Sequence, residues 1–352
     1  MGKTGISRAT AQGKDGVLRF AMPSDRIMEQ DALHFMEDCG LRVVRPSVRQ
    51  YQGEIAGVKG VSVLFQRSAD IPAKIDEGSV DIGIVGLDRY HESRNEKGDT
   101  SVIIEDLGFS KCELVLAVPN SWTHVCTTKD LGEVAREFKA QGNALRIATK
   151  YNRLSGKFLE SKGLKEYKLI QSSGAMEAAP SMGYADMIAD ISSSGATLRE
   201  NNLKTLDDGT VLKSQACLIG NKRLITKDPA KLQTTKRLLE LVEARLRAGI
   251  FYHIIGNIQG ESPEVVAKRV MSSSDVSGMQ GPTISRVYSK TGERDWFSVS
   301  VVVPMQRLTD GVEHLRKIGA SGVVVFPAHY VFENQCRAFQ TLVAKAPAAR
   351  GK

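Results

Sequence analysis

A run of small hydroxyl residues after an acid points most directly to chemistry. Asp190 ends the expected buried strand 186–190, and residues 192–197 precede the expected helix 198–202. Backbone N–H groups at a helix start are unpaired and carry partial positive charge, so small side chains there let a phosphate come close. The carboxylate of Asp190 can accept hydrogen bonds from sugar hydroxyls. The pattern therefore predicts a cradle for a ribose phosphate, with an ordinary Ser-rich turn as the alternative.

The expected cradle has a second carboxylate upstream. Glu177 is placed to hold ribose hydroxyls together with Asp190; its alternative role is to favour the dipole of an expected short helix, 177–182. Thr197 and Glu200 have the spacing of a capping box, so the start of the next helix is expected within a few residues of them. The full expected set is Glu177, Asp190, Ser192, Ser193, Ser194, Gly195, Ala196 and Thr197.

Composition and charge place the chain among globular proteins of two or three domains. It has 352 residues, 41% hydrophobic and 25% charged, with a formal net charge of +8. Basic residues are scattered and only 6% of residues are aromatic, which argues against nucleic-acid binding. Polyphosphate substrates would use the same excess charge locally. No apolar run approaches the roughly 20 residues of a membrane span, which argues against a membrane protein.

No reactive or metal-binding cluster is expected from the cysteines, the histidines or the first residues of the chain. The five cysteines are far apart and odd in number, which favours buried free thiols in a reducing compartment. The six dispersed histidines predict no metal cluster. Residues 1–16 are polar and are expected to be a disordered leader, either an added segment or the stub of a removed transit peptide.

Alternating apolar runs and helical patterns predict two α/β lobes. The continuous apolar run 80–85 is typical of a strand buried on both faces of a parallel sheet. Lobe I is expected at 17–118 plus 206–222, with 211–219 as a strand that returns to it, and lobe II at 119–205. This arrangement resembles periplasmic binding proteins, which place ligands between lobes at the carboxyl ends of strands. The other expected elements are strands 17–22, 61–66, 112–118, 145–149 and 168–171, and helices 27–39, 69–77, 128–140 and 154–161.

The remainder of the chain predicts a connecting helix and a small domain. Asp228-Pro229 opens an amphipathic helix through Ala248, within the connecting segment 223–249. A β-α-β-β-α-β order follows, which predicts a ferredoxin-like domain at 250–335 and a tail at 336–352. Its elements are expected at 251–258, 263–271, 283–289, 296–303, 309–318 and 322–326.

A long spaced pattern around the cradle gives the chain a family resemblance. Glu177, Gly183-Tyr184-Ala185, Ile188-Ala189-Asp190-Ile191 and Ser194-Gly195-Ala196-Thr197-Leu198 stand at the spacing of the ATP phosphoribosyltransferase signature. The chain resembles the long form of this family from about residue 17 to about residue 333. Segments such as Phe65-Gln66-Arg67 are most similar to its plant-type branch.

This resemblance implies the first step of histidine biosynthesis. The 5-phosphoribosyl group of phosphoribosyl pyrophosphate is transferred to N1 of ATP, and pyrophosphate leaves. No side-chain nucleophile is expected, because the leaving group is already good and catalysis consists of positioning two polyanions. Mg²⁺ is implied with the pyrophosphate, held mostly by substrate and water oxygens, so no protein metal ligand is expected.

The residues expected near ATP come from both lobes. A solvated surface charge is the alternative role for each arginine, and packing is the alternative for the tyrosine. The expected set is Ser24, Arg26, Arg49, Arg67, Asp70, Thr149 and Tyr151.

The long form of the family also implies regulation and assembly. Its ferredoxin-like domain binds histidine as a feedback inhibitor, here through Thr283, Ser321 and Gly322; the alternative is a domain that only builds the oligomer. The resemblance allows AMP as a second inhibitor and implies a homohexamer. It implies a cytoplasmic location, or the plastid stroma for a plant source.

Two positions depart from the family pattern. Asp25-Arg26-Ile27 stands where relatives carry a Lys-Gly-Arg-like triplet, so Arg26 is expected to supply the missing charge. Lys111 adds a positive charge near the crossing between the lobes. The alternative function is a non-catalytic, two-lobed regulatory protein that binds small molecules, and pyrophosphate release that needs both substrates would exclude it.

Overall fold

The computed structural model describes residues 16–172, 174–273, 279–288 and 295–344. The chain divides into two compact units, residues 1–236 with 341–352, and residues 237–340. The division falls inside helix α8, Pro229–Ala248, whose bounds agree with the sequence prediction. The predicted leader lies outside the described residues except for Gly16, and so does the end of the predicted tail, 345–352.

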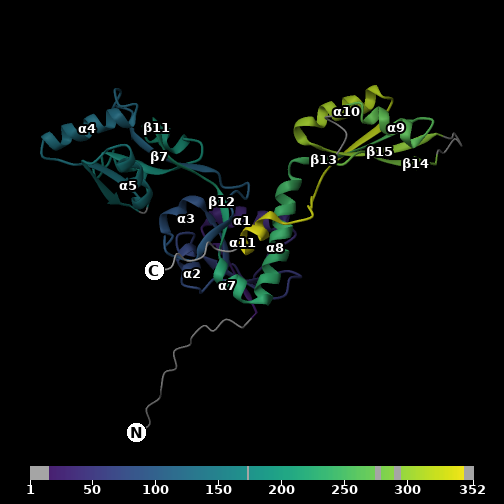
Figure 1. Ribbon diagram of the computed structural model, residues 1–352. Helices are drawn as coiled ribbons and strands as arrows, with labels where there is room; N and C mark the ends of the chain where they lie inside the picture. The colour runs from purple at the N-terminus through teal and green to yellow at the C-terminus, as the bar shows by residue number, and fades with distance from the viewer. Residues whose placement is uncertain (1–15, 173, 274–278, 289–294, 345–352) are drawn as a thin grey trace, which may run out of the picture. The chain divides into compact units, whose positions relative to one another are not determined.

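Lobe I of the first unit is built on a seven-stranded sheet of order β2-β3-β4-β1-β5-β12-β6. Its centre is parallel: β1 pairs with β4 on one side and with β5 on the other. Figure 1 labels strand β12 and helices α1, α2, α3 and α7 of this lobe. The strands are β1 Leu18–Pro23, β2 Val43–Val44, β3 Gln52–Ile55, β4 Val61–Gln66, β5 Ile82–Gly86, β6 Thr100–Ile104 and β12 Ala216–Asn221. The helices are α1 Arg26–Asp38, α2 Ile71–Asp76, α3 Leu87–Ser93 and α7 Lys222–Lys227.

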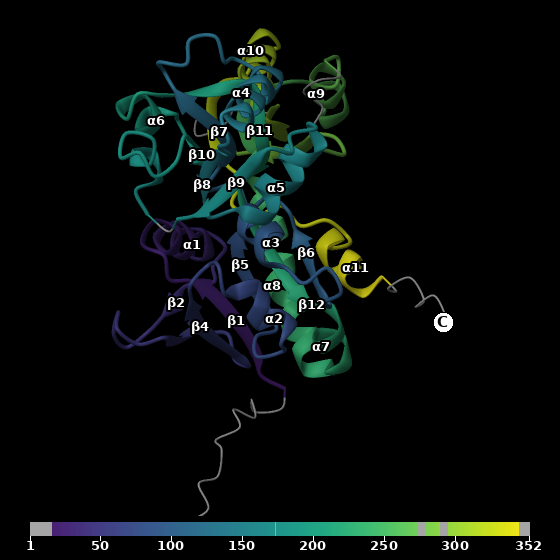
Figure 2. The same ribbon diagram turned by 90° about the vertical axis from the view of Figure 1, so that its left-hand side faces the viewer.

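Lobe II has a five-stranded sheet of order β11-β7-β10-β8-β9. Strands β10, β8 and β9 are parallel, and β7 runs antiparallel to both of its neighbours, β10 and β11. The labels in Figure 2 let the reader follow this order. The strands are β7 Cys112–Pro119, β8 Leu145–Thr149, β9 Tyr167–Gln171, β10 Met187–Ser192 and β11 Leu203–Ser214. The helices are α4 Thr128–Ala140, α5 Asn152–Ser161, the single turn η1 Met176–Ala178 and α6 Ala196–Glu200.

The return of the chain to lobe I was predicted wrongly. Residues 211–219 are not one strand: β11 stays in the lobe II sheet to Ser214, and β12 starts in lobe I at Ala216. The change of sheet therefore comes at Gln215 rather than at residue 206. Both crossings lie side by side, because Leu107 N donates to Ala216 O at 2.9 Å and Ala216 N donates to Phe109 O at 3.0 Å. Two register irregularities in β11 break the alternation that would have shown a strand of this length.

Three local predictions near the cradle also need correction. Strand β10 continues past Asp190 to Ser192. The expected helix 177–182 is only the turn η1, and helix α6 begins at Ala196 with Gly195 as its N-cap, so Thr197 and Glu200 do not form a capping box. The physical reason is the left-handed φ of 71° at Gly195, which lets the chain turn there without a side-chain cap.

The second unit contains a four-stranded antiparallel sheet of order β14-β15-β13-β16. Its elements follow the predicted β-α-β-β-α-β order: β13 Phe251–Gln259, α9 Pro263–Val270, β14 Thr283–Val287, β15 Trp296–Pro304, α10 Leu308–Lys317 (after the turn η3 Met305–Arg307) and β16 Ser321–Pro327. Helix α11, Arg337–Val343, was not predicted. Residue 289 of the predicted strand 283–289 lies outside the described residues.

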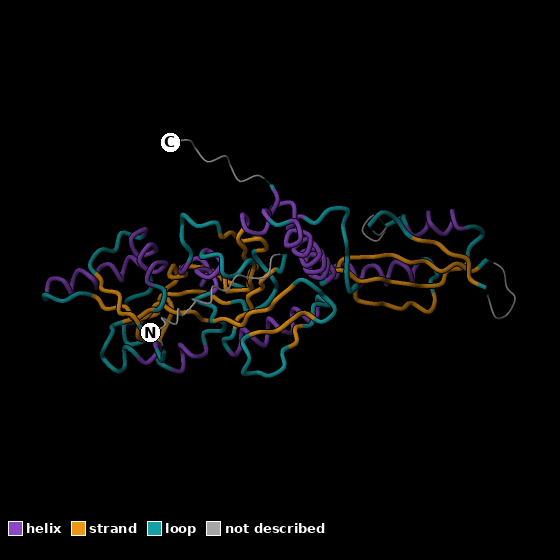
Figure 3. Tube along the Cα trace, turned by 90° about the horizontal axis from the view of Figure 1, so that it is seen from below, coloured by secondary structure: helices purple, strands orange, loops and turns teal. Residues whose placement is uncertain are grey.

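Alternation along the strands decides which face of this sheet is covered. Every second residue of β15, including Phe297 and Val299, is buried with Ile254 and Ile258 in one apolar cluster that also contains residues of α9 and α10. Figure 3 separates the strands from the helices by colour. The predicted fold class, two α/β lobes followed by a ferredoxin-like domain, is confirmed. Within the described ranges, none of the helices is long and apolar enough to span a membrane.

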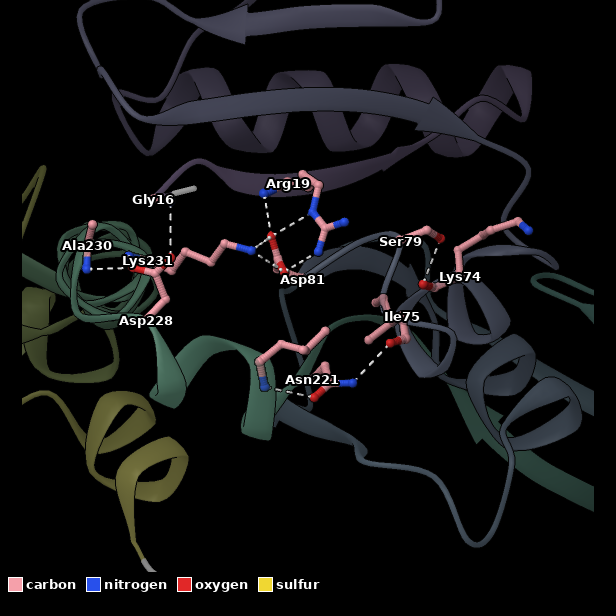
Figure 4. Close-up of polar contacts among 11 residues, drawn as sticks. Gly16, Arg19, Lys74, Ile75, Ser79, Asp81, Asn221, Asp228, Ala230 and Lys231 are labelled. Atoms are coloured by element: carbon pink, nitrogen blue, oxygen red, sulfur yellow. Dashed lines mark hydrogen bonds and ion pairs between the residues drawn. The ribbon is translucent and has the colours of Figure 1, made fainter. Parts of the chain in front are cut away.

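A buried carboxylate connects the central strands of the lobe I sheet to the start of α8. Asp81 is fully buried and accepts hydrogen bonds from Arg19 Nη2 at 2.7 Å and Lys231 Nζ at 2.9 Å. Figure 4 shows both cations converging on this carboxylate, with Asp228 accepting from Ala230 N at the start of the helix. The cluster joins β1, the loop before β5 and α8 within the first unit.

Candidate active site

The predicted cradle is a tight loop whose N–H groups are held by its own serines. Ser192 Oγ accepts from Gly195 N at 3.0 Å, and Ser194 Oγ accepts from Ala196 N at 3.4 Å. Arg199 Nη1 donates to Ser194 O at 3.2 Å, which brings a guanidinium against the loop. The loop therefore offers backbone donors, hydroxyls and a positive charge over a few residues, the groups that a phosphate accepts from.

A pocket of about 750 Å³ opens beside this loop, within the size range of small-molecule sites. Residues 192–195 line it together with β11 and the crossing segment between the lobes. Three basic side chains contribute to its wall: Lys111, Arg199 and Lys213. Lys111 is 3.5 Å from Asp106, and Lys213 is 3.5 Å from Glu113, both as exposed pairs that a polyanion could compete for. The added charge predicted at Lys111 thus lies in the wall of this pocket.

Asp190 lies next to the loop with a basic partner that the sequence analysis missed. Lys150 Nζ is 3.4 Å from Asp190 Oδ1, and Ile191 N donates to the same oxygen at 2.8 Å. Burial raises the pKa of Asp190, and the like charge of Glu177 raises it further, while Lys150 acts in the opposite direction. Glu177 lies on η1, and its charge acts on Asp190 strongly enough to raise the Asp190 pKa.

The residues of lobe I expected near ATP gather where β1 and β4 end. Ser24 N donates to Gln66 O at 2.8 Å, so the carboxyl ends of these parallel strands are adjacent. Asp25 Oδ2 accepts from Ser68 N at 2.7 Å, which commits its charge to the loop after β4. The exposed Arg67 and Asp70 follow on that loop, and the exposed Arg26 opens α1.

Arg49 belongs to the same neighbourhood. It lies exposed in the loop before β3, and Phe65 N of β4 donates to Tyr51 O two residues further on at 2.9 Å. The lobe I set is thus Ser24, Arg26, Arg49, Arg67 and Asp70, all at one end of the sheet.

Thr149 and Tyr151 are placed differently, because both are fully buried. Thr149 Oγ1 donates to Ala189 O at 2.7 Å and accepts from Tyr151 N at 2.9 Å. Tyr151 Oη donates to Asp88 Oδ2 at 2.5 Å, and Ser214 Oγ donates to Asp88 Oδ1 at 2.8 Å. Burial favours the packing alternative for Tyr151. Asp88, which the sequence analysis did not single out, joins lobe I to both the β8 end and the crossing strand.

Two more acids after Asp88 extend this junction between α3 and α5. Glu92 accepts from Arg153 N at 2.9 Å and Leu154 N at 3.0 Å, so it caps a helix of the other lobe. Glu96 accepts from Lys157 Nζ at 2.8 Å. The three acids are four residues apart along the chain, and all bind the segment 151–157.

The comparisons with known proteins decide the family. The ATP phosphoribosyltransferase family model matches residues 67–244, and the model described as "HisG, C-terminal domain" matches 251–330. ATP phosphoribosyltransferase 1, chloroplastic, from Arabidopsis thaliana is 38% identical over 90% of this chain and 78% of its own length. The chain belongs to the ATP phosphoribosyltransferase family. The predicted resemblance, including its plant-type character, is confirmed.

A bacterial ATP phosphoribosyltransferase, from Nitrobacter winogradskyi, is 33% identical over 92% of this chain and 97% of its own length. Among solved structures, "ATP phosphoribosyl transferase (HisG:HisZ) complex from Thermotoga maritima" is 26% identical, with a TM-score of 0.49, and covers 64% of this chain and 98% of its own. Membership makes the chain an ATP phosphoribosyltransferase enzyme, a pentosyl-group transferase of the first step of histidine biosynthesis that acts on ATP and phosphoribosyl pyrophosphate.

The residues expected to bind histidine are not brought together within one copy of the second unit. Thr283 lies on the edge strand β14, where it pairs with Ser300 of β15. Ser321 lies on the opposite edge strand β16, where it pairs with Asn257 of β13. Three strand spacings separate the two edges, roughly 14 Å. Gly322 follows Ser321 with a φ of 59°. A single histidine cannot bridge these two edges in one sheet.

Proposed function

We propose that the cradle formed by Glu177, Asp190 and residues 192–197 binds the ribose and the 5-phosphate of phosphoribosyl pyrophosphate. The observation that supports this proposal is the position of Asp190 near the carboxyl end of β10, next to a loop rich in donors, with the charge of Glu177 acting on the Asp190 pKa. Carboxylates accept from the ribose hydroxyls, while the N–H groups of Gly195 and Ala196 exchange their serine partners for phosphate oxygens.

The transfer then requires positioning rather than a nucleophilic side chain. N1 of ATP attacks C1 of the ribose, the bond from C1 to pyrophosphate breaks, and its electron pair leaves with the pyrophosphate oxygen. The thiol of Cys112 in the pocket wall is unsuited to covalent catalysis, because burial and the charge of Asp88 raise the pKa of Cys112 to about 11. Electrostatic stabilisation of the departing anion supplies the main catalytic effect.

Mg²⁺ is proposed as the metal that travels with the pyrophosphate. Among the described residues, no group of three or more His, Cys, Asp and Glu side chains is arranged to hold a metal ion. The ligands would therefore be oxygens of the substrate and water, with the acids of the pocket wall, Asp106, Glu113 and Asp207, as outer partners. Bound Mg²⁺ would neutralise part of the charge of the leaving group.

ATP is proposed to bind at the carboxyl ends of β1 and β4. The buried residues Thr149 and Tyr151 are proposed to support this site without exposed contact surface of their own. In this assignment Arg26 supplies the charge that the Asp25-Arg26-Ile27 triplet lacks at its first position. We expect Arg26→Ala to raise the KM for ATP by about tenfold to a hundredfold, the value of a charged hydrogen bond, and to change the KM for phosphoribosyl pyrophosphate by less than about twofold. Steady-state kinetics with each substrate varied in turn measures both.

Arg42→Ala is the matched control, because Arg42 is an exposed arginine of the same lobe between α1 and β2. It is expected to leave both KM values unchanged. Conversion of Asp25-Arg26-Ile27 to Lys-Gly-Arg is expected to be neutral or to improve ATP affinity. Equal ATP kinetics for Arg26→Ala and Arg42→Ala would make Arg26 a surface charge only.

The second unit is proposed to bind histidine as a feedback inhibitor, with AMP as a further inhibitor. Because Thr283 and Ser321 lie on opposite edges of one sheet, we propose that a site using both takes them from two copies of the chain, within a homohexamer. We expect Thr283→Val, which removes one neutral hydrogen bond, to weaken histidine binding by about twofold to tenfold in titration calorimetry.

Ser285→Ala is the control for this variant, since Ser285 lies two residues along the same strand on the same face of the sheet. It is expected to keep wild-type histidine affinity. Unaltered binding and inhibition in Thr283→Val would remove this residue from the site. An unmodified chain that binds no histidine would remove the regulatory proposal altogether.

Location is proposed from the relatives alone. The Arabidopsis relatives are named chloroplastic. We propose the plastid stroma if the source is a plant, and otherwise the cytoplasm.

A further inference from the structure

Lys150 lies between two residues expected in the site, Thr149 and Tyr151, yet it is no part of the family signature around Glu177 and Asp190. We propose that Lys150 is a substrate-binding residue of the transfer reaction: it pairs with Asp190 in the free enzyme and contacts the pyrophosphate at ribose C1 once phosphoribosyl pyrophosphate binds. This inference rests on the proposed function of the cradle.

The position of Lys150 carries the inference. It follows directly on β8, whose carboxyl end is adjacent to β10, and its Nζ is 3.4 Å from Asp190 Oδ1. The Lys150 side chain is 24% exposed and that of Asp190 is 14% exposed, so the pair is partly open to a ligand. Lys150 Nζ also lies 5.6 Å from the centroid of the Tyr151 ring, which is itself fixed by its hydroxyl bond to Asp88. The buried Tyr151 ring therefore helps to hold the Lys150 ammonium beside Asp190, where the ribose is proposed to bind.

The chemistry of the substrate matches an exchange of partners at this pair. In phosphoribosyl pyrophosphate, the 2-hydroxyl and the pyrophosphate oxygen are on neighbouring carbons of the ribose. The hydroxyl needs an acceptor and the pyrophosphate needs a donor, which are the two halves of the ion pair between Asp190 and Lys150. Binding therefore replaces one ion pair by two charge-assisted contacts.

The same contact would act in the transfer step. As the bond between C1 and oxygen breaks, its electron pair leaves on the pyrophosphate oxygen. The Lys150 ammonium donates a hydrogen bond to that oxygen and keeps its proton. Negative charge grows there during the step, so the contact is stronger in the transition state than in the bound substrate.

The first test compares Lys150→Met with Lys168→Met. Lys168 is an exposed lysine on β9, the edge strand of the same sheet, and serves as the control for charge and lobe. At alkaline pH, where Asp190 is ionised in every variant, Lys150→Met is expected to lower kcat/KM for phosphoribosyl pyrophosphate by about tenfold to a hundredfold. Calorimetry should show weaker binding of Mg-pyrophosphate and unchanged binding of ribose 5-phosphate, which lacks the C1 pyrophosphate. Lys168→Met should match the wild type in each measurement.

The second test is the pH profile of phosphoribosyl pyrophosphate binding. The carboxylate of Asp190 pairs with Lys150 and interacts electrostatically with Glu177, Tyr151 and Cys112, and burial raises its pKa. When the pH falls through that pKa, Asp190 gains a proton and loses acceptor capacity, so affinity falls on the acid side. Lys150 lowers the pKa, so Lys150→Met is expected to move the acid limb to higher pH. An unmoved limb would mean that the ion pair between Lys150 and Asp190 does not form in solution, while Mg-pyrophosphate binding tests the contact of Lys150 with the pyrophosphate itself.

Lys150→Arg keeps the charge and is expected to restore much of the binding and the position of the acid limb. The melting temperatures of Lys150→Met and Lys150→Arg, measured with the binding, separate a loss of function from a loss of folding. Wild-type Mg-pyrophosphate binding and an unmoved acid limb in Lys150→Met would overturn the inference. If the unmodified enzyme binds no phosphoribosyl pyrophosphate, it is instead the proposed function of the cradle that fails.

Discussion

Replacing Gly195 with valine is expected to lower kcat/KM for phosphoribosyl pyrophosphate by about tenfold to a hundredfold, which is the effect of losing one charged hydrogen bond. Gly195 has a φ of 71°, and a Cβ built on it would lie 2.8 Å from Arg199 Nη1. A branched side chain would therefore strain the backbone, displace the guanidinium and fill the space in front of the loop N–H groups. Steady-state kinetics, with phosphoribosyl pyrophosphate varied at saturating ATP, measures the effect.

Gly163→Val is the matched control for backbone strain. Gly163 also belongs to lobe II and has a φ of 78°, but a Cβ there would meet nothing within 4 Å. Both variants should lose a similar amount of stability, about 1–2 kcal/mol for a left-handed residue, and only Gly195→Val should lose activity. Equal kinetics for the two glycine variants would contradict the assignment of residues 192–197 to phosphate binding.

Replacing Asp81 with asparagine is expected to destabilise the first unit by about 3–5 kcal/mol, because it leaves two cations beside a buried neutral group. Asp81 is fully buried, while Arg19 and Lys231 are 18% and 13% exposed. Denaturant unfolding at neutral pH, followed by tryptophan fluorescence and circular dichroism, measures the loss. Glu77→Gln is the control, since it removes an exposed ion pair with Lys74 and should cost less than about 1 kcal/mol.

The stabilisation that Asp81 contributes is expected to decrease at acidic pH. Burial alone would raise the pKa of Asp81, but hydrogen bonds from Arg19 and Lys231 outweigh burial and hold the pKa below its ordinary value of 3.8. The stabilisation is therefore fully present above pH 3.8 and is lost as the pH falls through the lower folded pKa. The difference in stability between wild type and Asp81→Asn should shrink in that acidic window. A difference that stays constant there would mean that the ion pairs do not carry the stabilisation.

Strong periodicity and clear end signals made most of the fold predictable. Helix 128–140 and strand 145–149 were predicted with the bounds that the structure has. The short strands β2 and β3, by contrast, have too few apolar residues to show alternation, and helix α3 follows β5 with no loop to separate them. Tertiary pairing stabilises these elements, and local sequence carries little of that information.

In the candidate site, too, some residues could be found from local sequence and others only from the folded structure. Asp190 and the loop 192–197 could be singled out from the sequence because their residue types are unusual for a strand end and match a spaced signature. Lys150 and Asp88 were not predicted, since nothing in the local sequence shows that Lys150 pairs with Asp190 or that Asp88 is buried against Tyr151. The burial of Tyr151 depends on α3, an element that was not predicted. Long-range contacts of this kind can be found only once the lobes are folded.

The assignment of the transferase reaction is tested by the dependence of pyrophosphate release on both substrates. The purified full chain would be incubated with Mg²⁺ and with ATP, phosphoribosyl pyrophosphate, or both, and pyrophosphate and nucleotide mass would be measured. We predict pyrophosphate release only when both are present, in equal amount to a nucleotide heavier than ATP by one phosphoribosyl group. Binding of both compounds with no pyrophosphate and no heavier nucleotide would contradict the account and indicate a two-lobed binding protein without transferase activity.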